Sequence, residues 1–195
     1  MNTWINIPKN SDFTLHNLPY GIFIRDGRPT PGIAIGDQII DLHATSKIGL
    51  LHQLGFDVTV FESNVLNEFI GCGKNAWSSL RQYITAELIC EGDLFKNREK
   101  ILVDRFDVQM CLPIQIGDYT DFYSSIEHAT NLGKLFRPNS EPLLPNWRHI
   151  PVGYHGRASS IVISGTPIKR PQGQMKPPTS DFPVFGKSKR LDIEL

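Results

Sequence analysis

The 195-residue sequence lacks net charge, long apolar runs and a cysteine framework, and each absence excludes a class of protein. Twenty basic residues balance twenty acidic ones, so there is no electrostatic reason to expect nucleic acid or an anionic membrane as a partner. No apolar stretch approaches the roughly 20 residues that a membrane-spanning helix needs. Because residues 1–9 have no apolar core behind a basic start, we expect no signal peptide.

Cysteine is scarce, and its distribution favours a reducing compartment. Cys72, Cys90 and Cys111 are odd in number and lack metal-ligand spacing, so we interpret them as buried or free thiols. A cytoplasmic location is the default expectation. The hydrophobic content of 40% and the charged content of 21% are typical of a soluble globular protein with room for one or two domains.

The first part of the chain has the pattern of short strands joined by tight turns. Strands are predicted at Tyr20–Arg25, Gly32–Ile35 and Gln38–Leu42, with turn signals at Asp26-Gly27 and Gly36-Asp37. These connections are too short for βαβ crossovers. The pattern therefore predicts a small antiparallel barrel or meander.

Helices are predicted after these strands. Lys47–Leu54 and Val65–Ile70 are short candidates, whereas Asn75–Cys90 has apolar residues at helical spacing and is followed by Gly92 as a stop signal. We interpret its apolar stripe as core packing. Val108–Ile116 is apolar and is predicted to be extended.

The composition changes after Gly117, where polar and aromatic residues become frequent. Ile161–Ile163 has the pattern of a strand. Pro167–Pro183 is rich in proline and is predicted to be a loop outside any sheet. Leu191–Leu195 resumes strand-like alternation. Because a domain rarely stops at the start of a strand, we expect a fragment.

A capping box in the segment GDYTDFYSSIEHATNLGKLFR predicts a helix. Ser124 and Glu127 have the spacing of the box, so the helix should begin at Ser125. It should end before Pro138, because proline disfavours helical geometry in the residue that precedes it.

Asp121 and His128 flank the start of that helix and could face one pocket. His128 would lie in the first or second turn, where the positive helix end disfavours imidazolium and leaves a neutral base. A carboxylate near a neutral imidazole suits metal binding combined with proton abstraction. Spacing alone leaves alternatives open. His128 also aligns with Leu132, Leu135 and Phe136 as a core histidine would, and Asp121 could be a turn residue.

Tyr123, Arg137 and Tyr154 are the candidate substrate-binding residues. Arg137 could clamp a carboxylate with two N–H donors, and a solvated helix end is its alternative. Tyr154 lies in PVGYHGRASS, whose glycines suit a tight loop that lets backbone approach a ligand. A plain surface turn is the competing interpretation. His155 and Arg157 in this loop are secondary candidates.

Glu194 is the last candidate residue. It follows Asp192 at strand spacing, so both side chains point to one face. A buried carboxylate there would need a cation or hydrogen-bond donors. The alternative is an exposed strand face.

Taken together, these motifs resemble the fumarylacetoacetase family. GDYTDFYSS, HATN, PNW, PVGYHGRASS, SGTPI, GQMKP and LDIEL occur in the order and spacing of that family. HNLPYGIF and GIAIGDQIIDL, closer to the N-terminus, resemble the same enzymes. The resemblance therefore covers essentially the whole chain.

The resemblance implies a mainly β, α+β fold in two parts. Residues 1–116 would form a small SH3-like barrel with added helices. Residues 117–195 would open a mixed β-sandwich or roll that carries the active site.

The resemblance also implies hydrolysis of 4-fumarylacetoacetate to fumarate and acetoacetate, the last step of tyrosine and phenylalanine breakdown. Asp121 and Glu194 match metal-binding carboxylates, and the expected metal is Ca²⁺ or Mg²⁺. His128 matches the general base that activates water. The residues of the family that hold the substrate match Tyr123, Arg137 and Tyr154.

Part of the family's site falls outside this sequence. A second metal-binding glutamate would come one residue after Leu195, so we expect the 195-residue chain alone to be inactive. The expected partner is the small-molecule substrate, with no nucleic acid and no membrane, and the full-length protein is expected to be a homodimer. Two alternatives stay open: another diketo-acid hydrolase or decarboxylase of the superfamily, and a non-catalytic binding or assembly module.

Overall fold

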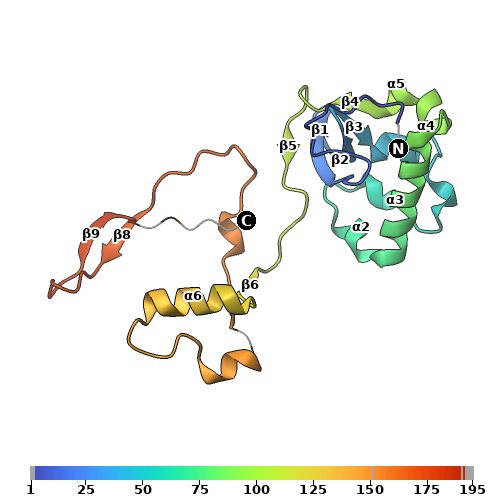
Figure 1. The fold of residues 1–195 in the computed structure, drawn as a ribbon. Coiled ribbons are helices and arrows are strands. Elements are labelled where there is room, and N and C mark those ends of the chain that lie inside the picture. Colours follow the sequence, from blue (N-terminus) through green and yellow to red (C-terminus); the bar gives the residue numbers. More distant parts are fainter. Residues whose placement is uncertain (1–2, 151, 190, 192–195) are drawn as a thin grey trace. The chain divides into compact units, whose positions relative to one another are not determined.

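A computed structural model describes residues 3–150, 152–189 and 191 (Figure 1). The chain divides into two units, residues 1–161 and 162–195. The second unit contains β8 (Gln172–Met175) and β9 (Val184–Lys187). The elements of the first unit, in chain order, are β1 (Tyr20–Arg25), β2 (Arg28–Ile35), β3 (Gln38–Asp41), α1 (Leu42–Lys47), η1 (His52–Leu54), η2 (Val58–Glu62), α2 (Asn67–Gly71), α3 (Gly73–Ile89), α4 (Asp93–Lys96), α5 (Arg98–Ile101), β4 (Leu102–Asp104), β5 (Met110–Cys111), β6 (Thr120–Phe122), α6 (Ile126–Phe136), η3 (Pro145–Arg148), β7 (Gly153–His155) and η4 (Ala158–Ser160).

An antiparallel sheet in the order β4-β3-β2-β1-β5 organises the N-terminal part of the first unit. Asp26 and Gly27 join β1 to β2, and both have positive φ angles, 51° and 75°. A two-residue hairpin turn of this hand matches the right-handed twist of the strands. The predicted strand at Tyr20–Arg25 and the turn after it are confirmed.

β2 begins at Arg28, earlier than predicted, although it contains Pro29 and Pro31. Arg28 pairs with Arg25 across the two-residue turn, so alternate residues starting at Arg28 bond to β1 and the prolines face the other way. β3 pairs with β2 only from Gly32 onward. The missing proline N–H groups therefore break no ladder bond with another described strand.

The fold class is α+β, as predicted, with more helical than strand residues among those described. The helical content is higher than that of a mainly β fold, and α3 alone spans 17 residues. Within the described residues the five-stranded sheet is open, since β4 and β5 are its edges and do not pair with each other. A closed barrel is therefore not formed there.

The short helices differ from the predicted ones. The Lys47–Leu54 prediction is wrong, because α1 already begins at Leu42 behind Asp41 as its N-cap and Gly49, with φ of 86°, follows its end. Only η1 forms in the rest of that stretch. Val65–Ile70 is shifted to α2, and Val108–Ile116 contains only the two-residue β5.

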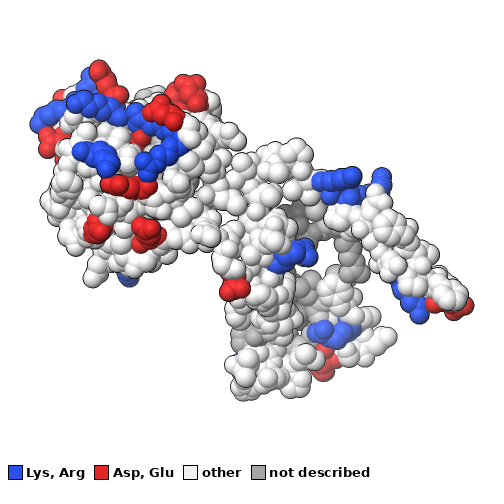
Figure 2. Space-filling view, turned by 180° about the vertical axis from the view of Figure 1, so that it is seen from behind, with Lys and Arg blue, Asp and Glu red and all other residues white. Residues whose placement is uncertain are grey.

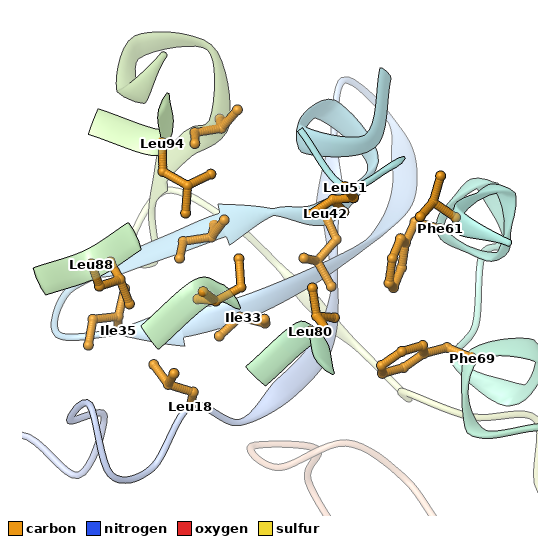
Figure 3. Packing of buried hydrophobic residues seen from close by; sticks show 14 of the residues in the cluster. Leu18, Ile33, Ile35, Leu42, Leu51, Phe61, Phe69, Leu80, Leu88 and Leu94 are labelled. Carbon is orange, nitrogen blue, oxygen red and sulfur yellow. The ribbon is translucent and has the colours of Figure 1, made fainter. Parts of the chain in front are cut away.

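The hydrophobic core lies between the sheet and α3 (Figure 3). Leu80, Ile84 and Leu88 have no exposed surface and belong to the same buried cluster as Ile33 of β2. Burying one such side chain stabilises the fold by roughly 1.5–3 kcal/mol. The predicted stripe comprised these three residues and Trp77, and it is confirmed except at Trp77, which is 37% exposed. No helix in the described part of the chain is long and apolar enough to span a membrane.

Asp41 connects three elements of this core. Its side chain is only 2% exposed. Oδ1 accepts the backbone N–H of Ala44 at 2.7 Å, which caps α1, and Oδ2 accepts Nη1 of Arg25 at 2.7 Å, which reaches β1. Arg25 also donates to the carbonyl of Lys100 at 3.1 Å, and the hydroxyl of Thr45 donates to the carbonyl of Asp41 at 2.5 Å.

Replacing Asp41 with alanine should lower the free energy of unfolding by about 2–4 kcal/mol, since it removes the buried carboxylate that pairs with Arg25 and a helix cap. The matched control is Asp37→Ala, whose ion pair with Arg105 is about a third exposed on both sides and should cost below about 1 kcal/mol. Denaturant titration of the chain measures both values. Equal losses for the two variants would contradict the central role of Asp41.

The hydroxyl of Tyr20 is buried and has no hydrogen-bond partner among the described residues. Its ring packs against Phe69 with the ring centroids 5.2 Å apart, and the Arg81 guanidinium lies 5.6 Å from its centroid. Burial raises the pKa of the Tyr20 phenol, and the positive charge of Arg81 opposes part of that rise. The hydroxyl therefore costs desolvation without forming a compensating bond.

We expect Tyr20→Phe to leave the free energy of unfolding unchanged or to raise it by up to about 1 kcal/mol, because the unpartnered hydroxyl is removed and the ring stays. Thermal or denaturant unfolding of both proteins gives the difference. A clear loss of stability would show that the hydroxyl has a partner in solution.

The second unit is a hairpin of β8 and β9. Gln172 pairs with Lys187 and Met175 with Val184. The prediction that Pro167–Pro183 stays outside any sheet is wrong, because β8 lies within this range. The four residues of β8 contain no proline, so none of them lacks the N–H that a strand needs. The strand predicted at residues 161–163 does not form. Of the strand predicted at 191–195, all but residue 191 lies outside the described residues.

Candidate active site

β6 and β7 form an antiparallel ribbon that places Asp121 directly opposite Tyr154. The phenol of Tyr154 donates a hydrogen bond of 2.6 Å to Oδ2 of Asp121. Asp121 is half-buried, and Tyr154 is 53% exposed. The ribbon thus joins one predicted metal ligand to one predicted substrate-binding residue, although 33 positions separate them in the sequence.

Two glycines of β7 and its end make room for aromatic rings from the other strand. A Cβ atom added to Gly153 would lie 2.3 Å from the ring of Phe122, and one added to Gly156 would lie 2.0 Å from the ring of Tyr119. Such cross-strand pairs of glycine and an aromatic residue stabilise a ribbon. At these positions the glycines of PVGYHGRASS therefore accommodate side chains of the protein.

His128 lies in the first turn of α6, behind a cap that differs from the predicted one. Ser125, and not Ser124, is the N-cap, and its Oγ accepts the backbone N–H of His128 at 3.3 Å. The hydroxyl of Ser125 also donates to Oε2 of Glu127 at 3.1 Å. The helix consequently starts one residue later, at Ile126. Its end before Pro138 is as predicted. His128 is exposed, so it is no core histidine.

Tyr123 connects the ribbon to the helix. Its ring meets the imidazole of His128 edge-on, with the ring centroids 6.2 Å apart and an interplanar angle of 75°. The backbone N–H of Tyr123 donates to the carbonyl of Val152 at 3.5 Å, which prolongs the ribbon. Tyr123 and Asp121 are two positions apart on an extended chain, so their side chains share one side. That Asp121 and His128 converge on one pocket stays a prediction.

Arg137 ends α6. Its Nη2 donates to the carbonyl of Pro142 at 2.7 Å. A Cβ atom added to Gly133 would lie 1.9 Å from the same carbonyl oxygen, so this loop packs closely on the helix. The contact matches the helix-end alternative for Arg137, and further N–H groups of the guanidinium can still bind a carboxylate. Its role in substrate binding stays a prediction.

The secondary candidates make local contacts. His155 Nε2 lies 3.9 Å from Oδ1 of Asp118, and both side chains are largely exposed. Nε of Arg157 donates to the hydroxyl of Ser160 at 3.2 Å. Asp118 and Tyr119 are not predicted as site neighbours by the sequence pattern. Only the register of β6 on β7 brings them beside this loop.

The site contains the type of ligand atom that a hard cation prefers. Asp121 supplies carboxylate oxygens, which Ca²⁺ and Mg²⁺ prefer. The described residues contain no group of three or more His, Cys, Asp or Glu that could hold a metal ion. Glu194, the second predicted ligand, lies outside the described residues. The described part of the chain therefore offers one carboxylate and not a complete coordination shell.

Because Ser125 caps the turn that carries His128, Ser125→Ala should weaken that turn by about 1 kcal/mol. Amide hydrogen exchange at His128 should then become roughly fivefold faster, as local opening becomes easier. Ser124→Ala is the matched control, since it lies next to the cap without forming it. If the two variants had the same effect, the assignment of the cap to Ser125 would be wrong.

The described chain is thus an α+β protein that presents a carboxylate on a strand and an imidazole on the following helix, a pair that metal-assisted hydrolases use. A family model described as fumarylacetoacetase N-terminal matches residues 16–113. The chain belongs to this family. The candidate site residues lie after that match, and their roles stay predictions.

Curated relatives match the chain along its full length. Rat fumarylacetoacetase is 48% identical over 99% of this chain and 48% of the relative. The human fumarylacetoacetase is 47% identical over the same shares. The Caenorhabditis elegans fumarylacetoacetase is 46% identical over 100% of this chain and 48% of the relative. The chain spans about half the length of the curated relatives that it matches.

Proposed function

We propose that this chain belongs to a fumarylacetoacetase that hydrolyses a carbon–carbon bond of 4-fumarylacetoacetate, giving fumarate and acetoacetate, as the last step of tyrosine and phenylalanine breakdown. The observation that supports this most directly is the 48% identity with the rat enzyme over 99% of the chain. The contacts of Asp121 with Tyr154 and of Tyr123 with His128 support it independently. Neither contact involves a residue of the five-stranded sheet.

His128 is the general base in this proposal. An exposed imidazole in the first helical turn can accept a proton from a water molecule, which then attacks the substrate carbonyl. The Ser125 cap positions its backbone, and the Tyr123 ring lies edge-on beside its imidazole. Efficient proton transfer requires base and water in a restricted geometry.

Arg137, Tyr123 and Tyr154 hold the substrate in this proposal. Arg137 pairs with a substrate carboxylate through two parallel N–H groups. The Tyr154 phenol is already bonded to Asp121, so it positions that carboxylate as well as lining the site. The two tyrosine rings supply apolar surface next to the polar groups.

Asp121 and Glu194 are the proposed ligands of a Ca²⁺ or Mg²⁺ ion. Oδ2 of Asp121 accepts the Tyr154 phenol, and the carboxylate has further lone pairs for a cation. When bound, such an ion would polarise the attacked carbonyl. The remaining ligands are expected from the part of the relatives that this chain does not cover.

The two proposed domains follow each other along the sequence. Residues 1–116 form an SH3-like domain, and residues 117–195 open a catalytic domain of mixed β-sandwich or roll type. The main buried cluster agrees with a first domain that ends before residue 117, because all its members lie between Ile5 and Ile101. The two compact units of the structure divide later, between residues 161 and 162. The proposed location of the full-length protein is cytoplasmic, and its proposed assembly is a homodimer.

In a full-length protein that contains this sequence, His128→Ala should lower kcat for fumarylacetoacetate hydrolysis by about 10²–10⁴-fold, the usual contribution of a general base. His149→Ala, which changes an exposed histidine with no proposed role, should leave kcat unchanged. Asp121→Asn should weaken activation by added Ca²⁺ or Mg²⁺. Product formation from fumarylacetoacetate measures all three.

The 195-residue chain alone should show no turnover under the same conditions, because it holds at most two of the proposed metal ligands. Turnover by this chain would refute the idea that its site is incomplete. Full activity of the His128→Ala protein would remove histidine from the mechanism.

A further inference from the structure

The five-stranded sheet has an outer face, opposite the face that packs on α3. Tyr20 of β1 pairs with Ile33 of β2, and both belong to the main core or pack against it. Side chains alternate between the two faces of a strand, so the next pair along, Gly21 and Gly32, lies on the outer face. This pair has no side chains there, and the outer face is bare at its centre.

The glycine pair lets neighbouring side chains lie close to the sheet backbone. A Cβ atom added to Gly32 would lie 2.6 Å from Cγ2 of Ile39 and 2.8 Å from the ring of Phe23. One added to Gly21 would lie 3.2 Å from Cε of Met110. Phe23 and Ile39 are therefore 1% and 4% exposed although they are on the outer face.

A pocket of about 290 Å³ opens over these side chains. Phe13, Ala34 and Met110 also line it, and Arg105 is the one charged residue of its described lining. Small-molecule sites are mostly apolar concavities of about 300–1,000 Å³ that contain a few placed polar groups. The pocket has this character and suits a ligand at the small end of the range.

The Arg105 guanidinium is held beside the pocket with hydrogen-bond donors to spare. Its Nε donates to Oδ1 of Asp37 at 3.1 Å, and its Cζ lies 5.4 Å from the ring centroid of Phe13 and 4.2 Å from that of Phe106. The Nη groups have no hydrogen-bond partner among the described residues. Two such N–H groups form the fork that binds a carboxylate.

The wider surface does not select an anion by itself. Figure 2 shows basic and acidic side chains next to one another on the visible face of the N-terminal part of the chain. Charges of both signs at an exposed surface largely cancel beyond the screening length, so a large polyanion has no extended basic surface to bind there. A small anion would instead be held by the one guanidinium that it touches.

We propose that this outer-face pocket binds a small aromatic monocarboxylate. The carboxylate pairs with the Nη groups of Arg105, and the aromatic ring of the ligand enters between Phe13, Phe23 and Met110. Phenylalanine rings and a thioether both make favourable contacts with an aromatic ring. None of these residues takes part in the proposed hydrolysis, so the two proposals can fail separately.

Phenylacetate is the probe that tests the pocket in the 195-residue chain. The NMR signals of the Met110 methyl group and of the Arg105 Nε–H should shift saturably, with a Kd at or below about 1 mM, the range open to a ligand of this size. Phenylacetamide has the same ring without the charge, and acetate has the charge without the ring. Each should bind at least about tenfold more weakly, because each lacks one of the two contacts.

Variants assign the binding to named side chains. Arg105→Gln should raise the Kd for phenylacetate at least about tenfold by removing the charged fork, and Ala34→Leu should do the same by filling the pocket. Arg98→Gln is the matched control, since Arg98 also lies over a ring, 4.4 Å from the centroid of Phe95, but not at the pocket. It should leave the Kd unchanged.

Asp37→Asn should change the affinity in the opposite direction. It removes a negative charge beside Arg105 and should lower the Kd about two- to fivefold, because that charge repels the carboxylate of the ligand. Loss of folding cannot produce tighter binding, so this variant keeps the test decisive even if the others unfold.

Three outcomes would overturn the proposal. Phenylacetate could fail to bind saturably, it could bind no better than phenylacetamide, or its binding could shift His128 and leave Met110 and Arg105 unchanged. The last result would place the carboxylate at the candidate active site. None of these outcomes bears on whether a full-length protein hydrolyses fumarylacetoacetate.

Discussion

The ion pair between the buried Asp41 and the partly exposed Arg25 is the interaction on which the N-terminal fold depends most. A carboxylate with 2% of its surface exposed would be strongly unfavourable without partners. Here it has two, one on β1 and one in the first turn of α1. The pair therefore determines where β3 ends, where α1 begins and how both are held against the first strand. The apolar stripe of α3 packs against residues of the sheet and completes the core.

The candidate site is held by a different kind of interaction. The large apolar core does not extend to the site residues, so local contacts position them: a serine cap under His128, an edge-on tyrosine ring beside its imidazole, and a phenol bonded to Asp121. Rings seated on Gly153 and Gly156 stiffen the ribbon that carries two of these groups. Such contacts fix orientations but add little stability. A catalytic geometry held within a fraction of an ångström needs a packed surrounding shell, which the described residues supply only in part around this site.

Sequence patterns predicted the elements that depend on near neighbours. The Asp26-Gly27 turn follows from two residues that tolerate positive φ, and α3 follows from a stripe of apolar residues at helical spacing. The errors have equally definite causes. The first half of β2 was not predicted because it contains Pro29 and Pro31. A strand tolerates proline only where no neighbouring strand bonds to its nitrogen, and here this depends on where β3 begins to pair with β2. Ser124 and Ser125 are neighbouring residues of the same type, and only the hydrogen bond from the backbone N–H of His128 identifies Ser125 as the cap.

The sequence by itself determined the α+β class, the first hairpin, the main helix and, through its long motifs, the family. These features depend on periodicity and on residue types that act within a few positions. Tertiary structure alone decided that Asp41 is buried against Arg25, that β2 runs through its prolines, and that Tyr154 lies opposite Asp121. Each of these depends on the register between segments far apart in the chain. Register is set by packing and hydrogen bonding of whole elements, and no local pattern of residues contains that information.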